Sequence, residues 1–597
     1  MPALNPMLNR ITERIEMRSQ KSRNDYEARM AHAATNGPAR AHLSCGNQAH
    51  AYAAMPQDQS VLAEGHAPNL GIVSAYNDML SAHQPFKTYP DLIKETARSL
   101  GASAQVAGGV PAMCDGVTQG QKGMELSLFS RDVIALAAAV ALSHNTFDGA
   151  LMLGVCDKIV PGLVIAAAEF GHIPIGFVPA GPMPSGITND EKAKARLAFA
   201  EGKIDRAALL RSEMSAYHSP GTCTFYGTAN SNQMLMEFMG LHLSGASFVP
   251  PDTPLREALT RNMTTRILHS APRAAEILTV KAFVNGIVGL MATGGSTNLV
   301  LHLPAMARAA GIILTPEDFS DISALTPLLT RVYPNGAADI NHFHAAGGLP
   351  LVIKTLLDHG LLHEDVQTVM GQGLQHYTQD AIMEQGSLSW RPTPPTSPNP
   401  AIIAPIDQPF QTTGGLTHLT GNIGVSLLKS SAIKADDHII SAPAAVFQSQ
   451  EDVKTAFKNN LLNRDVVVVV RFQGPSANGM PELHGLTPVL SILKGRGHKI
   501  ALVTDGRMSG ASGKIPAAIH MEPEAIKGGA IGQIQDGDMI HLNVDTGLLS
   551  CDADLTTRPH APAPEIPDAL GSGLFQIMRN AASLPSMGAS SFGADIT

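Results

Sequence analysis

The sequence is poor in the residues that mark several classes of protein. Only five cysteines and one tryptophan occur in 597 residues. Five thiols scattered along so long a chain exclude a disulfide-built scaffold, so we expect free thiols or metal ligands. No uninterrupted run of about 18 apolar residues occurs, which excludes a typical transmembrane helix. The first residues mix charged and polar side chains without an apolar signal core, so we expect a cytoplasmic protein with no membrane partner.

Basic residues are also too few to suggest a nucleic-acid partner. The formal net charge is −9 at pH 7, whereas nucleic-acid binders usually present a basic face. Hydrophobic residues make up 44% of the chain, which is typical of a compact globular protein. A chain of this length exceeds a single hydrophobic core, so two or more domains are expected. The net negative charge is still compatible with an anionic small-molecule substrate, because the local field of a site can oppose the net charge.

Hydrophobic patterning predicts a helical start followed by a large α/β domain. Residues 1–65 are polar with an amphipathic helical pattern, and residues 66–390 alternate short apolar runs with helical segments. Residues 70–75 and 150–155 are predicted strands, and residues 130–143 form a predicted alanine-rich helix. Such alternation is typical of βαβ units, so we expect a mainly parallel sheet.

The pattern of apolar and turn-forming residues changes after a proline-rich segment. Residues 391–404 cannot continue a helix and are interpreted as a linker. Five consecutive valines at 466–470 and an apolar run at 499–504 predict buried strands, and residues 536–547 carry turn signals between short strands. Residues 405–597 are therefore predicted to form a smaller, β-rich, barrel-like domain that closes the active site.

Two cysteine–aspartate pairs stand out in glycine-containing loops. Cys114 precedes Asp115, and Cys156 precedes Asp157 and Lys158. Each pair offers a soft sulfur to an iron–sulfur cluster and a hard oxygen to Mg²⁺. A single pair of this kind is more readily a buried thiol beside a turn-forming aspartate. Two pairs about forty residues apart favour a functional interpretation.

A third cysteine, Cys223, lies among small and hydroxyl residues at 221–233. Hydroxyl groups there could donate hydrogen bonds to cluster sulfurs, although a tight turn before a helix would look the same. The three cysteines lack the short Cys-x-x-Cys spacing of ferredoxins and zinc ribbons. Three ligands from separate loops would leave one iron of a [4Fe–4S] cluster open, and an open iron is a Lewis acid.

The β-rich half carries two loops with reactive side chains. Glu482 ends the loop 474–482 after the valine strand, and Arg507 and Ser509 lie in the loop 504–513 after the next strand. Taken singly, these loops are most simply exposed turns. Because they end neighbouring predicted strands, we expect them to close over one cleft.

Five ordered motifs resemble the dihydroxy-acid/phosphogluconate dehydratase family, from about residue 40 to residue 550. They are residues 113–116, 156–158, 221–224, 479–482 and 505–510. Residues 43–47, 74–83 and 221–230 are most similar to the branch of the family that acts on 6-phosphogluconate.

The resemblance implies a hydro-lyase of the Entner–Doudoroff pathway that forms 2-dehydro-3-deoxy-6-phosphogluconate and water. It also implies a homodimer with a sugar-acid phosphate as its substrate. A family member acting on a branched dihydroxy acid or an unphosphorylated aldonate is the alternative, and a non-catalytic iron–sulfur sensor is the alternative from another class.

The same resemblance implies a [4Fe–4S] cluster held by Cys156 and Cys223. Some relatives take the third ligand from a cysteine near residues 82–83, where this chain has alanine and histidine. Cys114 is the chosen third ligand because it adjoins Asp115, and Cys45 is the alternative.

The resemblance further implies Mg²⁺ at Asp115, Asp157 and Glu482. Lys158 matches a lysine that is carbamylated in several relatives, which would make it a carboxylate-like ligand. An unmodified Lys158 would instead bind the substrate carboxylate, and the sequence leaves both open.

Ser509 matches the proposed base of the family. A free serine is too weakly acidic for this role, so a nearby cation such as Mg²⁺ or Arg507 must lower its pKa. The histidines at 83, 302, 342 and 344 are expected to be mainly structural.

The substrate phosphate needs a site of its own, and residues 294–298 are the candidate. Two glycines there precede Ser296, Thr297 and Asn298, and backbone N–H groups with hydroxyl side chains suit an anion. A helix-capping turn explains the same residues equally well.

Overall fold

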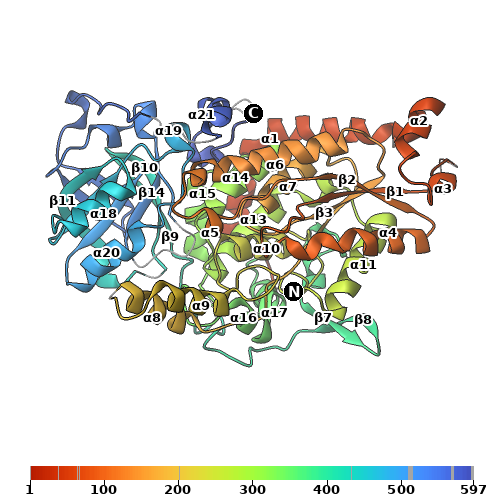
Figure 1. Cartoon of the computed structure of the whole chain (residues 1–597), viewed down its shortest axis with the longest axis horizontal. Helices are drawn as coiled ribbons and strands as arrows, with labels where there is room; N and C mark the ends of the chain where they lie inside the picture. The colour runs from red at the N-terminus through yellow and green to blue at the C-terminus, as the bar shows by residue number, and fades with distance from the viewer. Residues whose placement is uncertain are drawn as a thin grey trace.

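The computed structural model places the chain in two bodies, with the C-terminal part at one end of the molecule (Figure 1). It describes every residue except 1, 38, 64, 66, 201, 432, 509–514, 566–570 and 593–597. None of the helices in the described part of the chain is long and apolar enough to cross a membrane.

The N-terminal body is built on a four-stranded parallel sheet in the order β2-β1-β3-β4. Its strands are β1 (Asn69–Ser74), β2 (Ser103–Gly109), β3 (Gly149–Leu153) and β4 (Ile175–Val178). All residues of β1, β3 and β4 are buried, because parallel sheets are covered by helices on both faces. The predicted α/β domain with a parallel sheet is therefore confirmed.

Helices cover the two faces of this sheet. Helices α6 (Ser127–Leu142) and α7 (Ile159–Glu169) lie on one face, and α4 (Tyr89–Ser99) and α11 (Pro254–His269) lie on the other (Figure 1). The remaining α-helices of this body are α2 (Cys45–Tyr52), α3 (Gln59–Ala63), α5 (Asp115–Thr118), α8 (Asn189–Ala200), α9 (Arg206–Ala216), α10 (Thr228–Phe238), α12 (Ala274–Ile277), α13 (Val280–Thr293), α14 (Leu299–Ala309), α15 (Pro316–Leu325), α16 (Ile340–Ala345) and α17 (Gly348–Leu357), besides α1.

The first helix, α1 (Pro6–Thr35), packs along this body against α13 and α15. The side chain of Asn5 caps it by accepting hydrogen bonds from the backbone N–H groups of Met7 and Leu8. Arg14 and Arg18 both form ion pairs with the buried Asp318 of α15. The helical N-terminal segment is thus anchored by charge as well as by its apolar face.

The C-terminal body contains a closed eight-stranded barrel, which confirms the predicted β-rich, barrel-like domain. In the valine run, Val467 and Val469 belong to one core cluster, whereas Val466, Val468 and Val470 pack in another with α18 and α20. This alternation is the two-residue period of a strand buried on both sides. The strands, in barrel order, are β10 (Gly424–Lys429), β14 (Ala517–Glu522), β13 (Ile500–Thr504), β12 (Val466–Val470), β11 (Ile439–Phe447), β15 (Met539–Asn543), β16 (Leu548–Cys551) and β9 (Leu416–Gly421); the α-helices are α18 (Gln450–Lys458), α19 (Pro475–Asn478), α20 (Leu486–Gly495) and α21 (Gln576–Ala581).

A β-hairpin and an extended segment connect the two bodies. Strand β7 (Gln379–Glu384) pairs with β8 (Ser387–Pro392), so regular pairing continues two residues into the segment 391–404. Ile403 then forms an isolated bridge with Thr330 of the α/β body. The end of the proline-rich segment therefore lies against the α/β body. The bounds of the four predicted segments themselves stay predictions.

Candidate active site

The candidate site forms where strands of both bodies end. Cys114 and Asp115 follow β2 and begin α5, and Cys156 to Lys158 follow β3. Ligands of open parallel sheets bind at this carboxyl edge. Parallel barrel strands β12 and β13 lead to Glu482 and Arg507, which themselves pair as a parallel bridge. The two barrel loops therefore meet at these residues, and their closure over a cleft stays a prediction.

Three carboxylates converge at this point. One ligand oxygen each from Asp115, Asp157 and Glu482 lies within 4.8 Å of the other two. Burial and the neighbouring Asp115 raise the pKa of Glu482 to about 7, although Arg507 opposes the shift. Burial alone would raise the pKa of Asp157, but Lys158 and His302 hold it well below its usual range. Three hard oxygen donors so close together fit a divalent cation such as Mg²⁺.

Two buried cations face these carboxylates. The ammonium group of Lys158 is fully buried and forms ion pairs with Asp115 and, at 2.5 Å, with Asp157. Arg507 donates from Nη1 to Glu482 at 2.8 Å and from Nη2 to Asp115 at 3.1 Å. Its Nε donates to the carbonyl of Met480 at 2.8 Å, so the guanidinium is fixed on three sides. With all three carboxylates ionised, these two cations would leave the cluster with one net negative charge.

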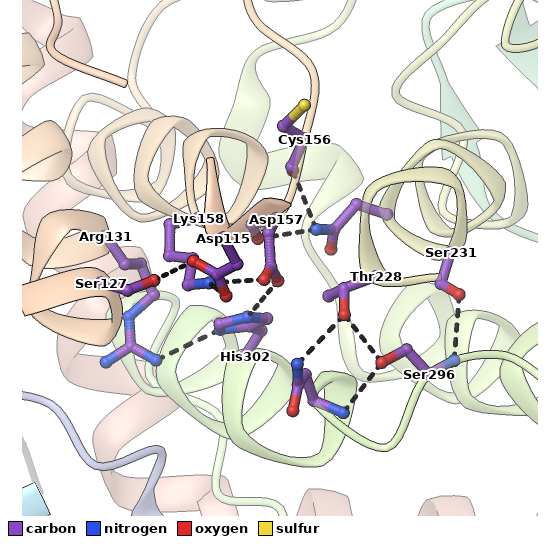
Figure 2. A network of polar contacts seen from close by, with 12 residues as sticks. Asp115, Ser127, Arg131, Cys156, Asp157, Lys158, Thr228, Ser231, Ser296 and His302 are labelled. Carbon is purple, nitrogen blue, oxygen red and sulfur yellow. Dashed lines mark hydrogen bonds and ion pairs between the residues drawn. The ribbon is translucent and has the colours of Figure 1, made fainter. Parts of the chain in front are cut away.

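His302 of α14 is a neighbour of the site that the sequence analysis assigned only a structural role. Its Nε2 lies 3.3 Å from Asp157 Oδ1, and its Nδ1 lies 3.4 Å from Arg131 Nη1 (Figure 2). An arginine can only donate, so Nδ1 accepts and Nε2–H donates to Asp157. Burial lowers the pKa of His302 to about 4, which keeps the ring neutral. His302 therefore orients Asp157, and no motif in the sequence signals it.

Three of the five thiols gather beside the carboxylates. Burial raises the pKa of Cys223 to about 12, and Cys114 adds to the shift. The pKa of Cys156 is raised by burial first, then by Cys114 and Cys223, which shows that the three groups interact. The sulfur of Cys156 points away from the carboxylate network (Figure 2). The donor set therefore fits two adjacent groups, a soft one on the thiols and a hard one on the carboxylates.

The backbone at Cys156 has a left-handed conformation and is held by a neighbouring side chain. Its φ is 78°, in the left-handed region that residues other than glycine rarely adopt. The buried Asn232 of α10 donates to the carbonyls of Cys156 at 3.1 Å and Asp157 at 2.8 Å. Asn232 is a second positioning residue that sequence analysis missed, although it lies within the motif at 221–233.

The other residues predicted for the site are not all found at this centre. Cys45 is exposed on α2, which lies at the end of the molecule opposite the barrel (Figure 1). Within one chain, the geometry therefore brings Cys114 and not Cys45 to the other two thiols. Ser509 lies outside the described residues, one position after Met508.

The loop at 294–298 contacts the site through Asn298. Its amide nitrogen donates to Glu482 at 3.0 Å and to Thr228 at 3.1 Å. The hydroxyl of Ser296 bonds that of Thr228 at 2.8 Å, and both Ser296 and Asn298 are fully buried (Figure 2). Thr297 is 8% exposed. These contacts support Glu482, and a phosphate role for the three residues stays a prediction.

Comparison with known proteins assigns both bodies to one family. The N-terminal part of the dihydroxy-acid/6-phosphogluconate dehydratase family matches residues 67–377, and its C-terminal part matches residues 401–589. The chain belongs to the dihydroxy-acid/6-phosphogluconate dehydratase family. The resemblance carried by the sequence motifs is therefore confirmed, and one matched region contains the parallel sheet while the other contains the barrel.

Relatives within this family match over nearly the full length. A phosphogluconate dehydratase of Rhizobium meliloti is 58% identical, covering 97% of this chain and 98% of the relative. One from Pseudomonas aeruginosa is 55% identical, covering 99% of both. A dihydroxy-acid dehydratase of Ignicoccus hospitalis is 34% identical over 80% of this chain and 85% of the relative. The chain is thus more similar to these phosphogluconate dehydratases than to that dihydroxy-acid dehydratase.

Proposed function

We propose that this chain is a hydro-lyase that converts 6-phosphogluconate into 2-dehydro-3-deoxy-6-phosphogluconate and water, the dehydration step of the Entner–Doudoroff pathway. The main observation that supports this proposal is that Asp115, Asp157 and Glu482 converge beside three interacting thiols. Both bodies contribute to these carboxylates. The choice of substrate is supported by 58% and 55% identity to phosphogluconate dehydratases, against 34% to a dihydroxy-acid dehydratase.

Two inorganic groups fit the donor sets. Cys114, Cys156 and Cys223 would hold a [4Fe–4S] cluster, and the three carboxylates would hold Mg²⁺. Together these groups supply Lewis acidity toward the substrate's carboxylate and hydroxyl groups. Lys158 has two compatible roles, as a carbamylated ligand or as a cation that binds the substrate carboxylate.

The side chains of the protein then position and move protons. Arg507 holds Asp115 and Glu482 in place, and His302 fixes the direction of Asp157. Ser509, as base, removes the C2 proton while hydroxide leaves C3, and the resulting enol tautomerises to the 2-keto acid. Serine needs a lowered pKa for this step, which a cation such as Mg²⁺ or Arg507 would supply.

We place the enzyme in the cytoplasm, as a homodimer with a small-molecule substrate. The motif resemblance supports the dimer. Size-exclusion chromatography with light scattering tests it, and a monomeric mass for the active enzyme would contradict it.

The decisive experiment is anaerobic purification with iron and sulfide quantified, followed by a substrate panel. We expect four irons per chain and turnover of 6-phosphogluconate, with gluconate and 2,3-dihydroxyisovalerate much poorer. Full activity in an iron-free preparation would overturn the proposal. A preference for either unphosphorylated acid would replace the substrate and keep the reaction.

A substitution tests the assignment of the base. Ser509→Ala should abolish turnover while the visible absorbance of the cluster is retained, because a base is lost and no cluster ligand is touched. Ser512→Ala, in the same segment, is the matched control and should remain active. Retained activity in Ser509→Ala would remove Ser509 as the base.

A further inference from the structure

A cleft of about 690 Å³ lies between the α/β body and the barrel, outside the carboxylate centre. Residues after α15 form one wall, and residues after β10 together with α20 form the other. Its polar lining side chains are Arg331, Asn335, Gln411, Ser431, Lys434, Ser491 and Lys494.

The cleft is cationic in a chain of net negative charge. Arg331, Lys434 and Lys494 line it, and no aspartate or glutamate lines it among the residues that the structure describes. Lys494 is paired with Asp437 at 2.7 Å. Arg331 and Lys434 are exposed and have no carboxylate partner among the described residues. The guanidinium of Arg331 lies over the ring of Phe410, 4.3 Å from the ring centre. Two such cations flanked by amide and hydroxyl donors suit a phosphate group.

A single loop separates this cleft from the proposed catalytic centre. Asn335 lines the cleft and donates to the carbonyl of Gly294 at 3.1 Å. Four residues further along the same loop, Asn298 donates to Glu482 at 3.0 Å. The buried Lys429 fixes the loop by donating to the carbonyls of Gly294 and Gly295, each at 2.9 Å. A linear substrate with an acid at one end and a phosphate at the other would extend past this loop.

The loop itself has few donors left for an anion. The N–H groups of Gly294 and Gly295 bond to backbone carbonyls of α13. Those of Ser296 and Asn298 bond to the hydroxyls of Ser231 and Ser296, at 3.0 and 3.2 Å. An anion in the cleft therefore needs its positive partners from the cationic side chains that line it.

We propose that this cleft binds the phosphate monoester of the substrate, with Arg331 and Lys434 as its principal ligands. The inference rests on the proposed function, because it requires a phosphorylated acid whose other end lies at Asp115, Asp157 and Glu482. It assigns the phosphate to cations on both bodies of the fold, in place of the side chains of residues 296–298.

The test compares the cluster-loaded enzyme with its Arg331→Met and Lys434→Met variants on 6-phosphogluconate. Each variant should raise KM about tenfold and leave kcat within about twofold, because an ionic hydrogen bond to a remote group contributes equally to ground and transition states. Lys458→Met, an exposed lysine of α18, is the matched control and should leave both constants unchanged. The affinity for gluconate, measured as competitive inhibition, should not change in either variant.

The possible outcomes separate this inference from the proposed function. An unchanged KM for 6-phosphogluconate in both variants would overturn the phosphate assignment. Equal weakening of gluconate and 6-phosphogluconate would also overturn it, because the cations would then serve the fold or the acid end. A wild-type enzyme that does not turn over 6-phosphogluconate would overturn the proposed function instead.

Discussion

At the residue scale, the proposed metal centre depends on a balance among charges that are almost fully removed from water. Arg507, 1% exposed, contacts both Asp115 and Glu482, so it links a carboxylate of the α/β body to one of the barrel. Removing one partner of such a buried pair leaves the other uncompensated, which is costly. Substitutions here must therefore preserve shape if their effect on catalysis is to be separated from their effect on folding.

Glu482→Gln is the substitution that meets this requirement. The amide keeps the volume of the carboxylate but removes one negative charge and a hard oxygen ligand. We expect the concentration of Mg²⁺ needed for half-maximal activity to rise, and kcat to fall, by about 100-fold. Activity measured across a Mg²⁺ titration checks this, with the cluster absorbance as a folding control. Glu451→Gln, an exposed glutamate paired with Lys454, should behave as wild type, and equal Mg²⁺ dependence in both variants would exclude Glu482 as a ligand.

Lys429 gives the fold a pH dependence of its own. Burial lowers the pKa of Lys429 to about 8, against an ordinary value of 10.5, so between these values the unfolded chain binds a proton that the native chain has released. Stability therefore rises with pH through this window. We expect the unfolding temperature of wild type, relative to Lys429→Met, to increase between pH 7.5 and about pH 10. A difference independent of pH would show that Lys429 stays charged in the native chain across this window and would contradict the lowered pKa.

At the scale of elements, strands and motif positions that depend on residues close together in the sequence could be predicted from it. The valine run becomes β12 with the predicted bounds, and the two Cys-Asp pairs lie after strands β2 and β3. The closing of the barrel could be predicted less specifically from the sequence, because β9 and β10 pair with strands about 100 residues or more away.

Residues that act through distant contacts were not predictable in the same way. His302 and Asn232 position Asp157 from α14 and α10, at sequence separations of 145 and 75 residues. Nothing in the spacing of a lone histidine or asparagine on a helix reveals such a contact. The motifs thus predict which groups do the chemistry, whereas the helices that hold them appear only once the fold is known.

Packing between α6 and α7 is close enough to test with one methyl group. A Cβ added at Gly162 of α7 would lie 2.5 Å from the carbonyl of Arg131 and 2.9 Å from Ile134 Cβ. Gly162→Ala should therefore destabilise the protein by about 1–3 kcal/mol, despite the better helix propensity of alanine. It should also lower activity, because α7 begins directly after Lys158. The control, Gly46→Ala in α2, has open space around the new methyl group and should be neutral or stabilising in the same thermal unfolding assay.

At the scale of the whole molecule, the proposed metal site spans the two bodies. Asp115 and Asp157 belong to the α/β body, and Glu482 and Arg507 belong to the barrel. Arg131 adds a further link by donating to the carbonyl of Gly588 at 2.9 Å, near the end of the described chain. A cation bound by all three carboxylates would therefore stabilise the contact between the bodies as well as the reacting groups.

This coupling predicts how the protein responds to loss of Mg²⁺. A ligand that binds only the native state stabilises it by about 2.7 kcal/mol at a concentration 100 times its Kd. Adding Mg²⁺ to chelator-treated protein should raise the unfolding temperature and draw the unfolding of the two bodies into one transition, as measured by calorimetry under anaerobic conditions. In Glu482→Gln the barrel loses its ligand, so Mg²⁺ should stabilise the α/β body less and no longer couple the barrel to it. An equal Mg²⁺-induced shift in wild type and Glu482→Gln would show that the cation does not bridge the bodies through Glu482.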